Sequence, residues 1–349
     1  MLRCILQKVV HHQKIGKADC RYLMEQMMHE QIDDIQLSAL LAALTTKGLQ
    51  EDELYAFAAA VQQYRQRVPM QQEVFDITGT GGGVKTFNIS TTASFVIASG
   101  GVAVAKHGTR AKTSRSGSAD VLEALGANIF LSPESCCEMI QQIGICYLYT
   151  RYYYYMMKRV DELQHKLGIE TIWDVLRPVS NPAPITRQLL GVNRADLVEP
   201  MAHVLARLGV QNGMVVYGRD GSDEISAAAN TLICEFSDNQ YKTYEICPEQ
   251  FSLPRCHASE LQGGTPKENA AITRRVLQGE TGPCRTAVLL NAGAGLYIGG
   301  ASLTLSAGIK RARRLIDSGI AWEKLEDFLV MSQNMGKVEK VKIATCQYK

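Results

Sequence analysis

The stretch DITGTGGGVKTFNISTTASFVIASGGVAVAKHGTRAKTSRSGSADVLE, residues 76–123, decides the fold. A short apolar lead-in enters the glycine cluster at 79–83, and residues 88–91 open an apolar helix. A strand is expected at 102–105, and it leads into a basic loop that begins with Lys106. The order of strand, glycine loop, helix, strand and basic loop is typical of an α/β domain.

The same stretch has the composition of an anion site. Consecutive glycines let backbone N–H groups approach an oxyanion closely. Ser90 and Thr91 stand at a helix start, where their hydroxyls can cap or donate, and Lys106 adds a positive charge. The loop matches neither a Walker A motif nor the GxGxxG dinucleotide fingerprint. Glycine clusters also form plain turns, but their combination with these residues in one unit favours a phosphate or pyrophosphate cradle.

Composition limits the class of protein. A chain of 349 residues can hold two domains, and 46% hydrophobic with 21% charged residues is ordinary for a soluble globular protein. The net charge of +2 is too small to indicate a nucleic-acid or membrane surface. The ten cysteines show no zinc-type spacing, which favours reduced thiols. We read no signal peptide and no apolar run of about 18 residues, so we expect a cytoplasmic protein.

Hydrophobic periodicity predicts the remaining elements. Apolar residues recur at helical spacing through residues 1–68, with a stop at Gly48. Helices are expected to start near Ser118 and at Pro133. Short apolar runs predict further strands, and a helix rich in alanine and glycine is expected at 292–298. The predicted strands lie at 128–131, 145–149, 214–217, 243–246 and 286–290.

The motifs of this chain resemble those of the anthranilate phosphoribosyltransferase family. The matching runs, in chain order, are GTGG, TFNIST, VAKHG, SRSGSADVLEALG, LGIETIWDVLRPVSNPA, DEIS, GGTPKENA and AVLLNAGAGLY. The resemblance covers nearly the whole chain. It implies an α/β fold of the nucleoside phosphorylase and phosphoribosyltransferase type, with a small all-helical domain and a large α/β domain around a central, mostly parallel sheet.

The resemblance also implies the domain organisation. Residues 1–70 would form the N-terminal helical domain, joined by helices from about 158–190. Residues 71–157 and 191–349 would form the α/β domain that binds the phosphoribosyl donor. In the family the helical domain carries the dimer interface, so a homodimer is expected.

The donor site is implied by the family motifs. The donor is phosphoribosyl pyrophosphate (PRPP), and the residues expected to bind it are Gly79, Thr80, Gly81, Gly82, Asn88, Ser90, Thr91, Lys106 and Ser118. Asp223 and Glu224, with an oxygen from Ser90, are expected to hold Mg²⁺ on the pyrophosphate. A bare Asp-Glu pair is usually a solvated turn, and it is the family match around it that favours a metal site.

The acceptor end departs from the family pattern. His107 is kept and is expected to contact the acceptor, together with Thr109, Tyr154 and Gln164. These last three stand where the family has asparagine, histidine and arginine. Loss of that arginine removes a fixed cation expected to meet a carboxylate.

Two further departures bear on the site. The glycine loop is one residue short and lacks the family's aspartate at Gly83. Around the tyrosine run at 152–155, Arg151, Lys158 and Arg159 are cations that could replace the lost arginine. The run itself is either an ordinary half-buried segment or an altered acceptor pocket with aromatic walls.

These observations predict transfer of the phosphoribosyl group from PRPP to an aromatic amine, either anthranilate, as in tryptophan biosynthesis, or a related aromatic acceptor. No residue is expected to act as a general acid or base, because the chemistry needs leaving-group charge stabilisation and positioning. One alternative is a nucleoside phosphorylase of the same fold. The other is a non-catalytic or nucleic-acid-binding paralogue, which would need a large basic surface.

Overall fold

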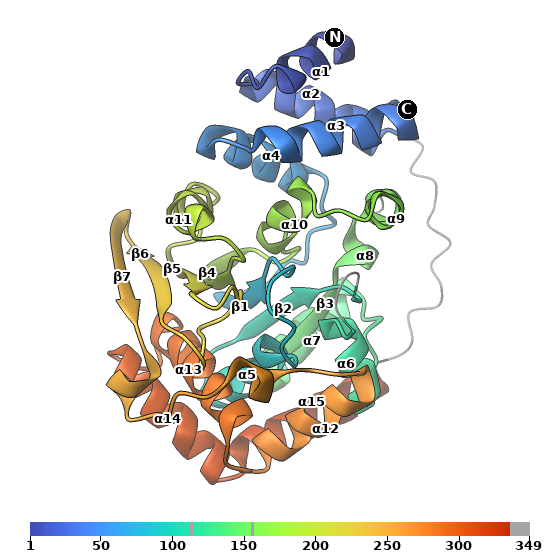
Figure 1. The fold of residues 1–349 in the computed structure, drawn as a ribbon. Helices are drawn as coiled ribbons and strands as arrows, with labels where there is room; N and C mark the ends of the chain where they lie inside the picture. Colours follow the sequence, from blue (N-terminus) through green and yellow to red (C-terminus); the bar gives the residue numbers. More distant parts are fainter. Residues whose placement is uncertain (112–114, 155–156, 336–349) are drawn as a thin grey trace.

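The computed structural model describes residues 1–111, 115–154 and 157–335 (Figure 1). The strands are β1 (Val74–Gly79), β2 (Val104–Gly108), β3 (Ile145–Tyr149), β4 (Ile185–Gly191), β5 (Asn212–Gly218), β6 (Thr231–Ser237) and β7 (Gln240–Ile246). The helices before β4 are α1 (Leu2–Val10), α2 (Lys17–Met28), α3 (Asp34–Lys47), α4 (Glu51–Gln63), α5 (Ile89–Ser99), α6 (Ser118–Leu125), α7 (Pro133–Ile143), α8 (Thr150–Tyr153), α9 (Met157–Leu167) and α10 (Ile172–Leu176). Those after it are α11 (Val198–Arg207), α12 (Pro266–Leu277), α13 (Pro283–Ile298), α14 (Leu305–Asp317) and α15 (Ile320–Asn334).

Four helices, α1 to α4, form a separate layer at the N-terminal end of the molecule, as Figure 1 shows. Local sequence sets their ends. The Asp33 carboxylate accepts a hydrogen bond of 2.8 Å from the Gln36 N–H at the start of α3. Gly48 ends α3 with a φ of +74°, a conformation that favours glycine. Helices α9 and α10 pack against α3, and α10 also packs against α4.

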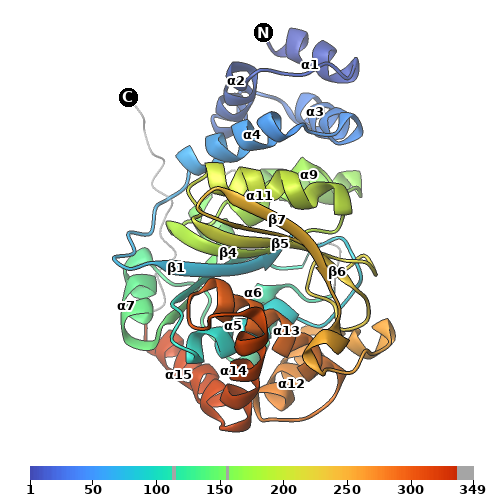
Figure 2. The ribbon, with the colours of Figure 1, turned by 90° about the vertical axis from the view of Figure 1, so that its left-hand side faces the viewer.

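The central sheet has the strand order β3-β2-β1-β4-β5-β6-β7. The first five strands in this order are parallel, and β6 and β7 add an antiparallel edge. Figure 2 shows the sheet between α9 and α11 on one side and α5, α12, α13 and α14 on the other. Parallel strands covered on both faces must be apolar on both faces, and β3 is buried along its whole length. Within the described residues, no helix is both long and apolar enough to cross a membrane.

Several sequence predictions are confirmed by the elements. The strands predicted at 145–149, 214–217 and 243–246 are found in β3, β5 and β7. Helices α6 and α7 begin at Ser118 and Pro133, as expected. The predicted strand at 102–105 starts later and continues through Gly108, so Lys106 and His107 belong to β2 rather than to a loop.

Three predictions are wrong. Residues 128–131 are irregular, because the Asn128 side chain accepts a hydrogen bond from the Phe130 N–H and the alternating Ile129 and Leu131 fill the core. Residues 286–290 lie within α13. That helix is buried on every side, so its sequence has no polar stripe to distinguish it from a buried strand. The helical segment expected at 158–190 ends early, because residues 185–191 form β4.

The carboxyl ends of β1, β2 and β5 converge at one edge of the sheet. Asp223 and Glu224 follow β5, and Asn291 on α13 fixes the next residue of their loop. The fully buried Asn291 amide accepts a hydrogen bond of 3.0 Å from the Ile225 N–H and donates one of 2.9 Å to the Ile225 carbonyl. It also donates to the Ala287 carbonyl at 2.9 Å. The buried Asn291 side chain therefore fixes the loop that carries Asp223 and Glu224 to α13.

Replacement of Asn291 tests this link between core and loop. Asn291→Ala leaves the buried N–H and carbonyl of Ile225 without partners, so we expect a loss of about 3 kcal/mol of stability. Thermal unfolding measures the loss. Asn334→Ala, at the exposed end of α15, is the matched control and should change stability by less than about 0.5 kcal/mol. Equal effects of the two substitutions would contradict the role given to Asn291.

Candidate active site

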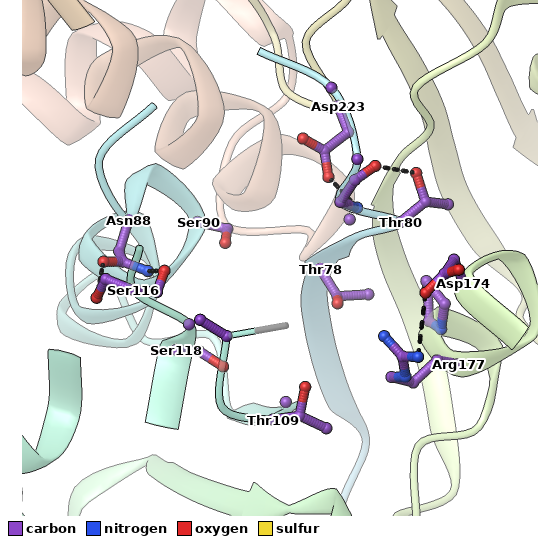
Figure 3. Close-up of a pocket in the computed structure, with 18 of the residues that line it drawn as sticks. Thr78, Thr80, Asn88, Ser90, Thr109, Ser116, Ser118, Asp174, Arg177 and Asp223 are labelled. Atoms are coloured by element: carbon purple, nitrogen blue, oxygen red, sulfur yellow. Dashed lines mark hydrogen bonds and ion pairs between the residues drawn. The ribbon is translucent and has the colours of Figure 1, made fainter. Parts of the chain in front are cut away.

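A cavity of about 550 Å³ opens at the carboxyl ends of the strands. This volume suits a small-molecule ligand. Residues from β1, β2, α5, α6, α9 and α10 line it, and Figure 3 shows the arrangement of several of them. The predicted site residues on its lining are Gly79, Thr80, Gly81, Gly82, Asn88, Ser90, Thr91, Lys106, His107, Thr109, Ser118, Gln164, Asp223 and Glu224.

The acidic pair Asp223 and Glu224 lies against the glycine loop and the start of α5. The Gly81 N–H donates to Asp223 Oδ2 at 2.7 Å, and the Ser90 N–H donates to Glu224 Oε1 at 3.2 Å. A Cβ at Gly79 would lie 2.1 Å from Asp223 Oδ2, so glycine is required there for the loop and the carboxylate to approach. The pair is therefore part of the cavity wall, and the solvated-turn alternative does not describe it.

Burial perturbs the charges of this wall. Desolvation, followed by repulsion from Asp223, raises the pKa of Glu224 to about 8. Desolvation also raises the pKa of Asp223, while it lowers the pKa of Lys106, which the carboxylates Asp76, Glu224 and Asp223 oppose. The Lys106 ammonium donates to the Ile77 carbonyl at 2.6 Å and to Ser90 Oγ at 3.4 Å. Perturbed, clustered titratable groups in a cavity are typical of functional sites.

The start of α5 faces the cavity with an unsatisfied donor. Thr91 Oγ1 is buried and has no hydrogen-bond partner among the described residues. Asn88, at the N-cap, instead ties the helix to its neighbours: its Oδ1 accepts from Ser116 Oγ at 3.1 Å and from Asn269 Nδ2 at 2.8 Å. A buried hydroxyl beside a helix N-terminus is suited to an anionic oxygen.

Two other residues that are predicted to bind PRPP, Thr80 and Ser118, make hydrogen bonds within the protein. Thr80 Oγ1 accepts a hydrogen bond of 3.1 Å from the Asn193 N–H. Ser118 Oγ lies 2.9 Å from the Tyr147 hydroxyl. The glycine loop itself needs its glycines, because Gly81 and Gly82 have φ values of +71° and +79°.

Of the residues predicted to contact the acceptor, His107 lines the cavity and Tyr154 does not. The His107 ring is buried, with Nδ1 2.7 Å from Asp76 Oδ2 and Nε2 3.1 Å from the Arg177 carbonyl, so both of its nitrogens face protein acceptors. Tyr154 is buried away from the described cavity lining, and its hydroxyl donates to the Ser180 carbonyl at 2.7 Å. The ordinary-segment reading thus fits Tyr154 better than the aromatic-wall reading.

A cation that we did not predict, Arg177, lines the cavity beside Gln164. The predicted substitutes are elsewhere: Arg151 pairs with Asp161 at 3.2 Å, and Arg159 donates to Asp34 at 2.9 Å. The Lys158 side chain lies outside the described part of the chain. Arg177 lies within the run LRPVSNPA, directly before Pro178. This arginine was the sequence signal that could have predicted a cation in the cavity wall.

Family comparisons agree along both regions. A model described as "Glycosyl transferase family, a/b domain" matches residues 71–322, and one described as "Glycosyl transferase family, helical bundle domain" matches residues 3–64. An anthranilate phosphoribosyltransferase of Methanobrevibacter smithii is 42% identical over 94% of this chain and 98% of its own length. One of Lacticaseibacillus paracasei is 43% identical over 95% of this chain and 98% of its own length. The chain belongs to the anthranilate phosphoribosyltransferase family.

Solved structures of the anthranilate phosphoribosyltransferase family share the fold. The Thermus thermophilus structure has a TM-score of 0.88 at 36% identity, covering 94% of this chain and 99% of its own. A Saccharomyces cerevisiae structure in complex with PRPP and Mg has a TM-score of 0.86 at 26% identity, covering 95% and 98%. The predicted fold class, a small helical domain beside a large α/β domain with a mostly parallel sheet, is confirmed.

The donor set of this family member fits Mg²⁺. Asp223 and Glu224 offer hard oxygen ligands, and the Ser90 hydroxyl lies beside them. No group of three or more His, Cys, Asp or Glu in the described ranges could hold a metal ion by itself. A site with two carboxylates suits a cation that keeps water and completes its shell with substrate phosphates.

The raised pKa of Glu224 predicts the pH dependence of the metal-free protein. Below the ordinary pKa of 4.5, the Glu224 carboxyl is neutral in both the folded and the unfolded protein. Between pH 4.5 and about pH 8, only the folded protein keeps this proton. The stability contributed by this proton is therefore lost as pH rises through about 8. Glu224→Gln cannot titrate, so the variant should melt near wild type at pH 5 and roughly 3 °C or more higher at pH 9.

Thermal melts in a chelator, with and without added Mg²⁺, measure the effect. The variant should also lose any stabilisation that Mg²⁺ gives to the wild type. A variant that melts below the wild type at pH 9 would contradict the assigned environment of Glu224.

Proposed function

We propose that this chain transfers the phosphoribosyl group from PRPP to anthranilate and releases pyrophosphate, a step of tryptophan biosynthesis. The observation that carries the proposal is the convergence of the partly buried Asp223-Glu224 pair, Lys106 and the start of α5 in one cavity. Full-length similarity to anthranilate phosphoribosyltransferases supports it. The same similarity supports a transferase over a phosphorylase or a non-catalytic paralogue.

The donor's anions are proposed to lie between the glycine loop and α5. Gly79, Gly81 and Gly82 allow close backbone approach, and Thr91 offers its unsatisfied hydroxyl. Thr80, Asn88 and Ser118 complete this side of the cavity. Asp223 and Glu224, with Ser90, would hold Mg²⁺, which would supply positive charge to the leaving pyrophosphate.

The protein's part in the reaction is charge stabilisation and positioning. The amine nitrogen bonds to the anomeric carbon as the carbon–oxygen bond to pyrophosphate breaks, and the nitrogen then gives a proton to water. Lys106 lies beside Ser90 and the acidic pair, where its charge meets the negative charge that develops on the leaving group. The amine needs a fixed approach rather than a protein base.

Other features of the proposal concern organisation. We propose a helical domain of residues 1–70 with the segment that holds α9 and α10, and an α/β domain over 71–157 and from β4 onward. The match of the family models to 3–64 and 71–322 supports this division.

Exposed apolar side chains on the helical domain, among them Ile35 at 83% exposure, support a homodimer through that domain. We propose a cytoplasmic location, as befits a biosynthetic enzyme using PRPP.

Turnover tests the function directly. We expect the purified protein to consume anthranilate, followed by its fluorescence, only when PRPP and Mg²⁺ are both present, with one pyrophosphate released for each anthranilate. Asp223→Asn should abolish the magnesium dependence together with most of the activity. Failure of the wild type with anthranilate and with other aromatic amines would overturn the proposal.

Lys106 gives a second prediction. Lys106→Met keeps the buried stem but removes the charge, so kcat should fall about 100-fold or more while the fold is retained. Steady-state kinetics and a thermal melt measure the two properties. Lys310→Met, at an exposed position of α14, is the matched control and should keep wild-type kinetics. A loss below tenfold in Lys106→Met would contradict the role of the charge.

A further inference from the structure

Arg177 projects into the cavity from the wall formed by α10 and the turn after it. Figure 3 shows Asp174 and Arg177 on one side of the cavity, with Asn88, Ser116 and Ser118 on the opposite side. Asn88 and Ser118, at the starts of α5 and α6, therefore lie across the cavity from this guanidinium, while Thr80 of the glycine loop lies on the same side as Arg177. A phosphate held at the starts of α5 and α6 would lie away from Arg177, which meets whatever occupies the near side.

The guanidinium is hydrogen-bonded to two side chains, and Oδ1 of a third residue, Asp161, lies 3.9 Å from its Nη2. Arg177 Nη2 donates to Gln164 Oε1 at 3.2 Å and to Asp174 Oδ1 at 3.1 Å. Gln164 is fixed in turn, because its Nε2 donates to Thr171 Oγ1 at 2.7 Å and to Asp174 Oδ2 at 2.8 Å. Gln164 thus orients Arg177 instead of presenting its own amide donors to the cavity.

The backbone of Arg177 is fixed as well. Its carbonyl accepts hydrogen bonds from His107 Nε2 at 3.1 Å and from Ser180 Oγ at 2.6 Å. The His107 ring is itself anchored on Asp76. A side chain held at both ends loses little conformational entropy when it binds a ligand.

Arg177 retains donors that nothing in the described protein uses. A guanidinium has five N–H groups, and Nη2 supplies only two of them. Nε is buried with no hydrogen-bond partner among the described residues. The contacts of the described chain likewise leave Nη1 without an acceptor. A buried, unsatisfied N–H group of a cation in a cavity wall calls for an anionic partner.

The other strong cations of the described lining have assignments elsewhere. Lys106 faces Ser90 and the acidic pair. Arg110 pairs with Asp120 and Glu123 of α6, on the side of the cavity that carries Ser118. Lys85 is an exposed residue of the glycine loop. Arg177 is therefore the cation placed to meet an anion on the side of the cavity away from the starts of α5 and α6.

We propose that Arg177 binds a carboxylate on the acceptor and so determines specificity, with Gln164 and Asp174 as its positioning residues. This inference rests on the proposed function and deepens it. It explains how the cavity can receive an aromatic amine carrying a carboxylate although Gln164 stands where the family has arginine. The positive charge is supplied by Arg177, which directly follows α10, and Gln164 holds its guanidinium in position.

Steady-state kinetics of Arg177→Gln tests the inference. The carboxylate takes no part in the new bond and keeps its charge throughout, so its contact stabilises ground and transition states alike. We expect the KM for anthranilate to rise about 10- to 100-fold, with kcat and the KM for PRPP within about twofold of wild type. The preference for anthranilate over the neutral 2-aminobenzamide should fall by the same factor. Arg177→Lys, which keeps the charge without the fork, should give an intermediate KM.

Two further variants complete the design. Gln164→Leu removes one acceptor of Nη2 and should raise the anthranilate KM roughly 3- to 10-fold with kcat unchanged. Arg275→Gln, at an exposed arginine of α12 that pairs with Glu280, is the matched control and should keep wild-type constants. Thermal melts establish that each variant is folded.

The outcomes separate this inference from the function on which it rests. Wild-type turnover with an unchanged anthranilate KM in Arg177→Gln would overturn the inference and leave the transferase activity intact. A fall in kcat or a rise in the KM for PRPP, with no change in preference over 2-aminobenzamide, would also overturn it. A wild type that releases no pyrophosphate with any aromatic amine would instead overturn the function, and the inference with it.

Discussion

Two partly buried carboxylates, Asp223 and Glu224, stand next to each other in the chain and face a buried lysine, and the rest of the site depends on this arrangement. Burying like charges is unfavourable without compensation. The Gly81 and Ser90 N–H groups and Lys106 compensate in part, and neutralisation of Glu224 does so in the metal-free state. The site is thus built to be completed by a divalent cation and an anionic substrate.

The fold supplies what this arrangement needs. Parallel strands end at one edge of the sheet, so the loops after β1, β2 and β5 meet there. Asn291 pins the acidic loop from the core side, and Gly79 and Gly191 leave room for Asp223, whose carbonyl would lie 1.6 Å from a Cβ at Gly191. The residues that pack the core therefore also hold the loops that face the donor in place.

The sequence predicts the donor half well, because its signals are local. Residues 76–123 carry the glycines, the helix-start hydroxyls and Lys106 in one continuous unit. Helix α13 was mistaken for a strand in part, because a helix buried all round lacks amphipathic periodicity. Arg177 escaped prediction because its place in the cavity depends on the turn after α10 and on contacts with Gln164 and Asp174. Tyr154 is the opposite case. The family motif predicts that this residue contacts the acceptor, but its side chain packs inside the protein.

The central claim is that the acidic pair of the cavity wall is completed by Mg²⁺ and PRPP together. Calorimetric titration of PRPP into the purified protein, with Mg²⁺ present and then with chelator, tests it most directly. The account predicts saturable binding with one PRPP per chain that weakens at least tenfold without Mg²⁺. Equal affinity in both conditions, or no binding in either, would contradict it.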